Sequence, residues 1–119
     1  MDNRQLVIDG FRRFAAGDIE VLRTLLHEDF VEHSPGNPSG RDAFIEHIGN
    51  APVAGAALEL HRVVADDDLV VVHYAMAPRG ATTSSAVVDI WRLADGLIVE
   101  HWDVVQPVPA PDRIPNGMF

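Results

Sequence analysis

Apolar positions in the first half of the chain recur mostly with the period of an α-helix. In residues 3–17 they return every three or four positions, which predicts an amphipathic helix ending at Gly17. Residues 19–27 repeat the pattern behind Asp18, a favourable N-cap, and predict a second helix. A third helix is expected to start at Ser39, three residues before Asp42 as in a capping box, and to end near residues 49–50. Between the last two, residues 30–33 predict a short extended segment, and the prolines and glycine of residues 34–38 predict a loop.

The second half of the chain contains aliphatic runs separated by turn residues, which is typical of antiparallel strands. Residues 58–64 and 69–77 form one such pair around an acidic turn, and residues 87–107 form another. Four prolines from Pro107 onwards exclude a further central strand. Helices grouped before strands predict an α+β fold, in which three N-terminal helices pack on a curved antiparallel sheet of about four strands. Such a cone-shaped barrel can enclose a pocket.

The last predicted hairpin carries ionisable residues inside apolar strands, where they are costly unless they are paired or line a wet pocket. If residues 94–96 form a three-residue loop, Leu93 pairs with Leu97. Asp89 then faces His101, with Asp103 diagonally beside it on the same face.

A two-residue loop at residues 95–96 would instead move Asp89 to the face opposite His101 and Asp103. The three-residue loop is favoured because it gathers the ionisable groups on one otherwise apolar wall, as in a small-molecule pocket.

Composition limits the classes of function. The 119 residues suit one domain spanning residues 1–119, and no run approaches the ~18 apolar residues of a membrane span. The absence of cysteine excludes thiolate chemistry, and no secretory signal is evident, so a cytoplasmic location is expected. The chain has no lysine and a formal charge of -9, which argues against nucleic-acid partners.

Three stretches carry a resemblance to a known family. They are FVEHSPGNPSGRDAFIEHI at residues 30–48, VVDIWRLADGLIVEHWDVVQPVP at residues 87–109, and the closing NGMF. With the helical N-terminus, this pattern resembles the SnoaL-like proteins of the nuclear transport factor two-like superfamily. The resemblance implies a cone fold with a pocket between helices and sheet, often dimeric through the outer face of the sheet.

The resemblance also implies a chemistry. Polyketide cyclases of this family close a ring by intramolecular aldol condensation, using an aspartate as acid and base without metal or cofactor. By motif that aspartate falls on Asp103. The second catalytic group of the cyclases is a histidine on the preceding strand. At that strand this chain has Asp89, with His101 facing it. The chain looks more like a small stand-alone member of the family than like an aromatic polyketide cyclase.

The candidate catalytic residues are therefore Asp103, His101 and Asp89. Desolvation would raise the pKa of Asp103, which could then remove a proton next to a carbonyl group and return it to an oxygen. Asp89 and His101 would adjust the pKa of Asp103, since two adjacent carboxylates do not both ionise easily. Each of the three could alternatively be a structural group that pairs with its neighbours. The candidate substrate-binding residues are His33, His73, Trp91, Phe44 and Trp102. For His33, the family resemblance implies a side chain that points into the pocket.

Two functions from different classes follow. The first is a small cofactor-independent enzyme for aldol-type cyclisation, isomerisation or dehydration of an apolar carbonyl compound. The second is a non-catalytic module of the same fold that binds a small molecule or dimerises. A homodimer is expected through the apolar outer face formed by Val88, Ile90, Trp102 and Val104. No metal is expected, because the histidines and aspartates show no ligand spacing.

Overall fold

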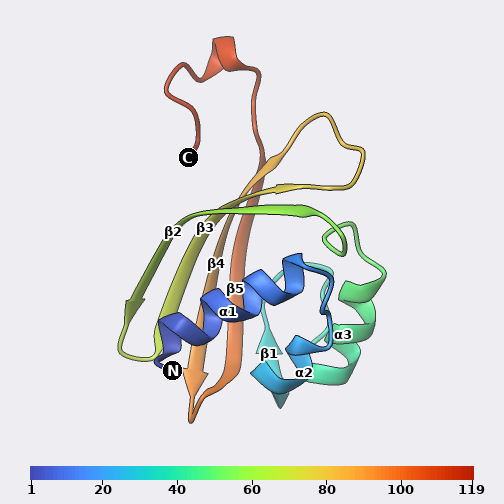
Figure 1. The fold of residues 1–119 in the computed structure, drawn as a ribbon, viewed down its shortest axis with the longest axis vertical. Coiled ribbons are helices and arrows are strands. Elements are labelled where there is room, and N and C mark those ends of the chain that lie inside the picture. The colour runs from blue at the N-terminus through green and yellow to red at the C-terminus, as the bar shows by residue number, and fades with distance from the viewer.

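Three helices cover one face of a single curved sheet (Figure 1). The computed structural model describes all residues 1–119 and confirms the α+β class. The sheet has five strands in the order β1-β5-β4-β3-β2 and is not closed into a barrel. No helix is long and apolar enough to cross a membrane. The elements are α1 (Asn3–Ala15), α2 (Val21–Leu25), β1 (Leu26–Glu32), α3 (Arg41–Gly49), β2 (Ala57–Asp66), β3 (Leu69–Ala77), β4 (Ser85–Ala94), β5 (Leu97–Pro107) and the 3-10 turn η1 (Pro111–Arg113).

The strand β1 is the main departure from the prediction. The second helix ends at Leu25 rather than at residue 27, and the chain enters the sheet at once. The helical prediction was wrong there because Leu26 and Phe30, both 1% exposed, are spaced by four residues, which suits a helix and a strand equally. Since β1 pairs parallel with β5, the sheet has one more strand than expected and is not wholly antiparallel.

The third helix also begins differently. It starts at Arg41 behind Gly40, and Ser39 does not cap it. The Ser39 hydroxyl instead accepts a hydrogen bond from the backbone N–H of Glu32, at 3.0 Å. The capping-box prediction was therefore wrong, because Ser39 ties the loop back to the end of β1.

The hairpin of β4 and β5 closes with two residues rather than three. Ala94 pairs with Leu97, and Asp95 and Gly96 both have positive φ angles, 52° and 78°. These angles are typical of a type I′ turn, for which Asp-Gly is a preferred sequence. The predicted three-residue loop was wrong.

A β-bulge nevertheless places the ionisable groups on one face. Arg92 pairs with Glu100 and Leu93 with Ile98, so Val99 is an extra residue in β5. One extra residue reverses the faces of everything beyond it. Asp89 consequently lies directly opposite Asp103, and His101 lies opposite Trp91, with all four side chains on the inner face.

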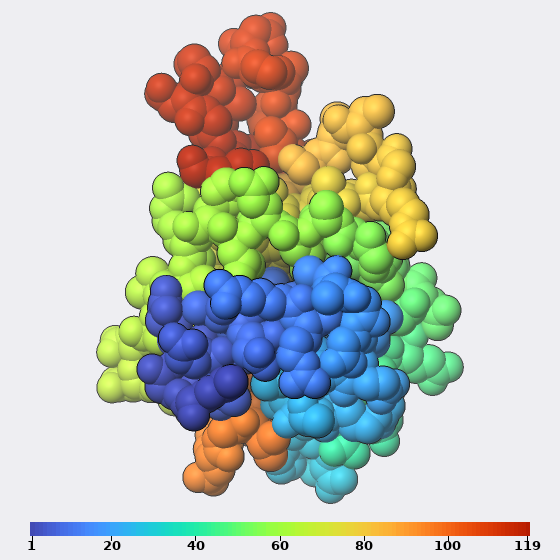
Figure 2. Space-filling model, viewed as in Figure 1, coloured from blue at the N-terminus to red at the C-terminus, as the bar shows by residue number.

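The core lies between this inner face and the helices. Val70, Val72 and Tyr74 of β3 point inward, each at most 6% exposed. The ring of Phe11 in α1 packs edge-on against Tyr74, with ring centroids 5.1 Å apart. Alternation along β3 therefore sends His73 to the outer face. Figure 2 shows α1 lying across the front of the molecule.

The C-terminal tail does not close the inner face. It projects beyond the strands and folds back toward β2 (Figures 1 and 2). The ring of Phe119 stacks on the rings of His61 and His73, with centroids 4.6 and 5.5 Å apart. Because His73 points outward, the tail packs on the outer face of β2 and β3.

Candidate active site

A cavity of about 280 Å³ lies between the helices and the inner face of the sheet. Sixteen of its 23 lining residues are hydrophobic, and its walls include aromatic residues of α1, α3 and the strands. The charged residues in the lining are Asp89, His101 and Asp103. The cavity thus combines an apolar interior with one charged wall, as small-molecule sites do.

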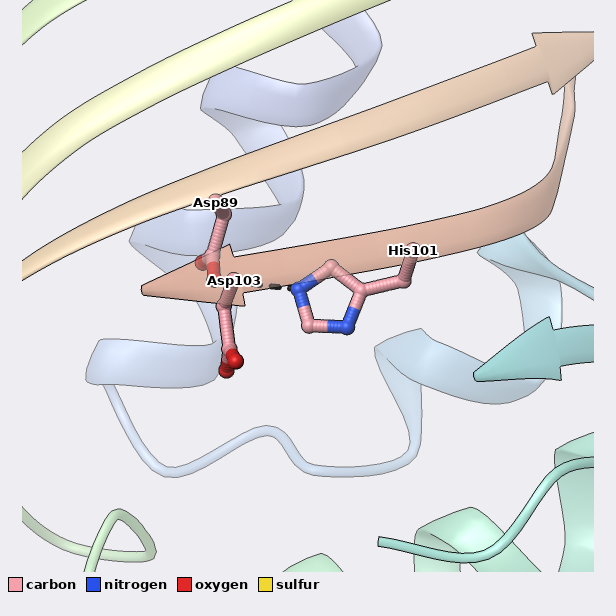
Figure 3. A group of neighbouring side chains, drawn as sticks. All are labelled: Asp89, His101 and Asp103. Atoms are coloured by element: carbon pink, nitrogen blue, oxygen red, sulfur yellow. Dashed lines mark hydrogen bonds and ion pairs between the residues drawn. The ribbon is translucent and has the colours of Figure 1, made fainter. Parts of the chain in front are cut away.

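The three charged side chains lie close together on β4 and β5 (Figure 3). His101 Nε2 is 3.0 Å from Asp89 Oδ1, and both side chains are about 5% exposed or less. Asp103 is less deeply buried than Asp89 and accepts a hydrogen bond from the Ser34 hydroxyl at 2.9 Å. Asp103 is therefore the carboxylate that a ligand can reach, and Asp89 lies behind it beside the histidine.

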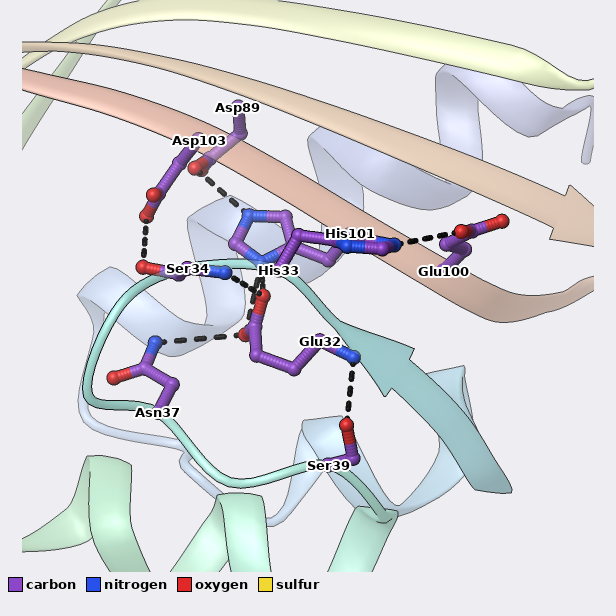
Figure 4. Close-up of polar contacts among 9 residues, drawn as sticks. All are labelled: Glu32, His33, Ser34, Asn37, Ser39, Asp89, Glu100, His101 and Asp103. Carbon is purple, nitrogen blue, oxygen red and sulfur yellow. Dashed lines mark hydrogen bonds and ion pairs between the residues drawn. The ribbon is translucent and has the colours of Figure 1, made fainter.

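Glu32, at the end of β1, completes the group and was missed from the sequence. His101 Nδ1 lies 2.7 and 3.0 Å from its two carboxylate oxygens (Figure 4). The Glu32 side chain is 0% exposed. Because β1 pairs with β5 across about seventy residues of chain, no local sequence pattern could have placed Glu32 beside His101. The only available signal was its position immediately before His33, in the stretch of residues 30–48 that resembles the family.

The loop after β1 connects the two carboxylates. The backbone N–H of Ser34 donates to Glu32 at 2.9 Å, while its hydroxyl donates to Asp103. The side-chain amide of Asn37 donates to Glu32 at 3.5 Å. Ser34 and Asn37 also line the cavity, so this loop orients both carboxylates from the ligand side.

His101 is held as an imidazolium. Burial by itself disfavours its charged form, but hydrogen bonds and charges from Asp89 and Glu32 outweigh burial and raise the pKa of His101 to about 9. Burial also opposes ionisation of Glu32, yet its bonds to His101, Ser34 and Asn37 lower its pKa. The wall therefore carries an ion pair that is formed at neutral pH.

Burial raises the pKa of Asp89, and the facing Asp103 carboxylate adds to this effect, whereas His101 and Tyr74 oppose it. Burial likewise raises the pKa of Tyr74, and the negative charges of Asp89 and Asp103 raise it further. Tyr74 lines the cavity, and its hydroxyl therefore remains protonated at neutral pH.

The structure separates the predicted substrate-binding residues into two groups. Trp91 and Phe44 line the cavity, and the Trp91 ring stacks on His101 with centroids 3.8 Å apart. The remaining three, His33, His73 and Trp102, do not line it. The bulge that turns His101 and Asp103 inward turns Trp102 outward, and alternation does the same for His73.

His33 belongs to an outer-face group. Its ring stacks on Trp102, with centroids 5.0 Å apart and planes within 1°. Its Nε2 lies 2.7 Å from Glu100, which Arg92 also binds through two nitrogens. Hydrogen bonds from His33 and Arg92 lower the pKa of Glu100. The expectation that His33 points into the pocket does not fit this geometry, because Glu100 and Trp102 hold it outside.

A metal ion could in principle contact this wall. One potential ligand atom from each of Asp89, His101 and Asp103 lies within 4.8 Å of the others. Metal binding at His101 Nε2 would require loss of a ring proton that Asp89 stabilises, at a pKa of about 9. The donor set therefore suits proton transfer better than metal binding.

The fold and the charged cavity define a small α+β protein with a site suited to acid and base chemistry. A family model described as SnoaL-like domain matches residues 7–101, and the chain belongs to this family. The match ends at His101, two residues before Asp103. No curated protein matches the sequence.

Solved structures share the fold. An NTF-2 like protein of unknown function from Burkholderia xenovorans has 20% identity and a TM-score of 0.79, covering 98% of this chain and 92% of that one. IdmH from Streptomyces antibioticus, a candidate polyketide cyclase, has 24% identity and a TM-score of 0.68, covering 88% and 93%. A candidate ketosteroid isomerase from Kribbella flavida has 20% identity and a TM-score of 0.77, covering 93% and 85%. At such identities the likeness shows the fold alone.

The raised pKa of His101 predicts a pH-dependent stability. Because the pKa rises from about 6.5 in the unfolded chain to about 9 in the folded one, the stabilisation is complete below pH ~6.5 and is lost as pH rises through ~9, by up to roughly 3 kcal/mol. Urea unfolding at intervals across this range measures it. The same loss of stability with rising pH should be measured for the control variant His47→Gln, because His47 is an exposed histidine on α3. A constant or rising free energy of unfolding would contradict the ion pair.

Glu32→Gln should lower the pKa of His101 by roughly one unit or more, because the amide can accept the Nδ1 hydrogen bond but carries no charge. NMR titration of the imidazole measures the change. Glu100→Gln is the matched control, since Glu100 contacts His33 and not His101. Equal His101 pKa values in the two variants would show that Glu32 does not maintain the imidazolium.

Proposed function

We propose that this protein is a cofactor-independent enzyme that transfers a proton at the carbon next to a carbonyl group. Aldol-type cyclisation, isomerisation and dehydration all begin with this step. The observation that carries the proposal is the wall of the cavity, where a reachable Asp103 faces a buried Asp89 beside a charged His101.

In the proposed reaction, Asp103 accepts the proton as the C–H bond breaks, and the bonding electrons move onto the carbonyl oxygen. The hydroxyl of Tyr74 stays protonated and can transfer its hydrogen bond from Asp89 to that oxygen. His101 holds Asp89 in place beside Asp103 through a hydrogen bond of 3.0 Å. Asp103 then returns the proton to carbon or oxygen. Ser34 orients its carboxylate throughout.

The alternative is a binding module without catalysis. Such a module needs no coupled carboxylates, and its aspartates could be bonded to backbone amides in a filled interior. Here the aspartates bond to side chains, Asp89 to His101 and Asp103 to Ser34, and they line an open cavity. This arrangement supports the enzyme over the module.

A homodimer through the outer face of the sheet is also proposed. The outer residues Val88, Ile90 and Trp102 form a half-buried apolar surface, and Val104 beside them is 70% exposed. Exposed apolar surface of this kind is usually covered by a partner.

Asp103→Asn should abolish the proposed chemistry. With acetophenone as probe, exchange of the acetyl protons in D₂O, followed by proton NMR, should be faster with the protein than in buffer. The variant should lose roughly 10²- to 10⁴-fold of that acceleration, as expected for a general base. The exposed Asp66→Asn variant is the matched control and should exchange like the wild type.

Exchange by Asp103→Asn at the wild-type rate would remove Asp103 from the mechanism. Wild-type protein that exchanges no faster than buffer would favour the binding module. Circular dichroism of each variant verifies that the fold is retained.

Sedimentation velocity at micromolar concentration should give a dimer, and Val104→Arg should shift it to monomer by placing charge in the interface. Val105→Arg is the matched control, because Val105 is the next residue of β5 but lies on the cavity side of the sheet. A wild-type monomer, or equal effects of the two substitutions, would refute an interface on the outer face.

A further inference from the structure

The cavity has no cation available for an anionic ligand. The nine basic residues of the chain are all arginines, and none of them lines the cavity. The nearest on the hairpin, Arg92, points outward and binds Glu100. A carboxylate or phosphate on a ligand would therefore find no arginine to pair with.

The one positive charge in the wall is already neutralised. His101 presents Nδ1 to Glu32 and Nε2 to Asp89, so both ring nitrogens have a carboxylate partner. An anion could bind the imidazolium only by displacing one of two buried carboxylates. Displacement is costly, because the freed carboxylate would remain buried without a partner.

The wall is instead negative toward the ligand. Asp103 is the most accessible of its charged groups, with Asp89 beside it and Glu32 behind the histidine. The carboxylates of Asp103 and Glu32 outnumber the one imidazolium even when Asp89, whose pKa burial raises, holds a proton. Repulsion between like charges is strong in a cavity whose other walls are mostly apolar, since the local dielectric is low.

Size and shape add a second restriction. The volume of about 280 Å³ lies below the ~300–1,000 Å³ usual for drug-sized ligands, so it suits a molecule of one or two rings. Five aromatic rings, those of Phe11, Phe14, Phe44, Tyr74 and Trp91, line it. Flat apolar ligands pack well against such walls.

We infer that the site takes a neutral, flat carbonyl compound of one or two rings and rejects the carboxylate analogues of the same skeleton. The inference rests on the proposed function in treating a carbonyl group as the one that reacts. It goes further by assigning the charge and size class of the substrate from the composition of the cavity.

A matched pair of probes tests this inference. Methyl 4-acetylbenzoate is neutral, and 4-acetylbenzoate has the same skeleton with a carboxylate. Dissociation constants from ligand-observed NMR at pH 7.5 should favour the ester by at least about tenfold. Asp103→Asn, which removes one negative charge, should strengthen binding of the acid more than that of the ester. Asp66→Asn should change neither.

Exchange of the acetyl protons, measured in the same samples, separates this inference from the proposed function. Selective binding of the ester without exchange would support the inference that the site takes neutral ligands and would contradict the proposed enzymatic function. If both probes bind with equal affinity and both exchange their acetyl protons, the proposed enzymatic function is supported and the inference of a neutral ligand is overturned. Tighter binding of 4-acetylbenzylammonium than of the ester, or no binding of the ester at millimolar concentration, would also overturn it.

Discussion

A buried imidazolium clamped between two carboxylates is the interaction on which the site depends. His101 on β5 reaches Glu32 on β1 and Asp89 on β4, so one side chain joins three adjacent strands. Removing one partner of such a buried group is expected to be strongly destabilising, because an uncompensated charge remains. The clamp also fixes the wall from which Asp103 faces the cavity. Structure and chemistry here rest on the same three side chains.

Much of the fold could be predicted because it depends on local patterns. Helical periodicity located α1, and aliphatic runs located β2 to β5 within a few residues. The strand β1 could not be recognised as part of the sheet, since its parallel partner is distant in sequence and the spacing of Leu26 and Phe30 is ambiguous. Ser39 was misread as a cap because its true partner, the N–H of Glu32, lies in another element.

The site could be predicted in part, and for a reason that proved different from the one assumed. Asp89, His101 and Asp103 do share a face, but the Val99 bulge, not a three-residue loop, brings this about. A bulge in a run of aliphatic residues leaves no mark on the hydrophobic pattern. Glu32 was missed because only the tertiary pairing of β1 reveals it. His33 was expected in the pocket from the resemblance, and Glu100 with Trp102 holds it on the outer face.

The single extra residue in β5, Val99, determines which side chains of this strand face the cavity. Side-chain identity alone does not decide which residues line the cavity, because the bulge at Val99 sets which residues of β5 face inward from Glu100 onwards. If the same residues paired without the bulge, Asp89 would lie opposite Trp102, which would face the cavity, and His101 and Asp103 would lie on the outer face. In this hairpin, the choice between a bulged and a regular pairing therefore changes the ligand-facing surface of β5 more completely than any point substitution does.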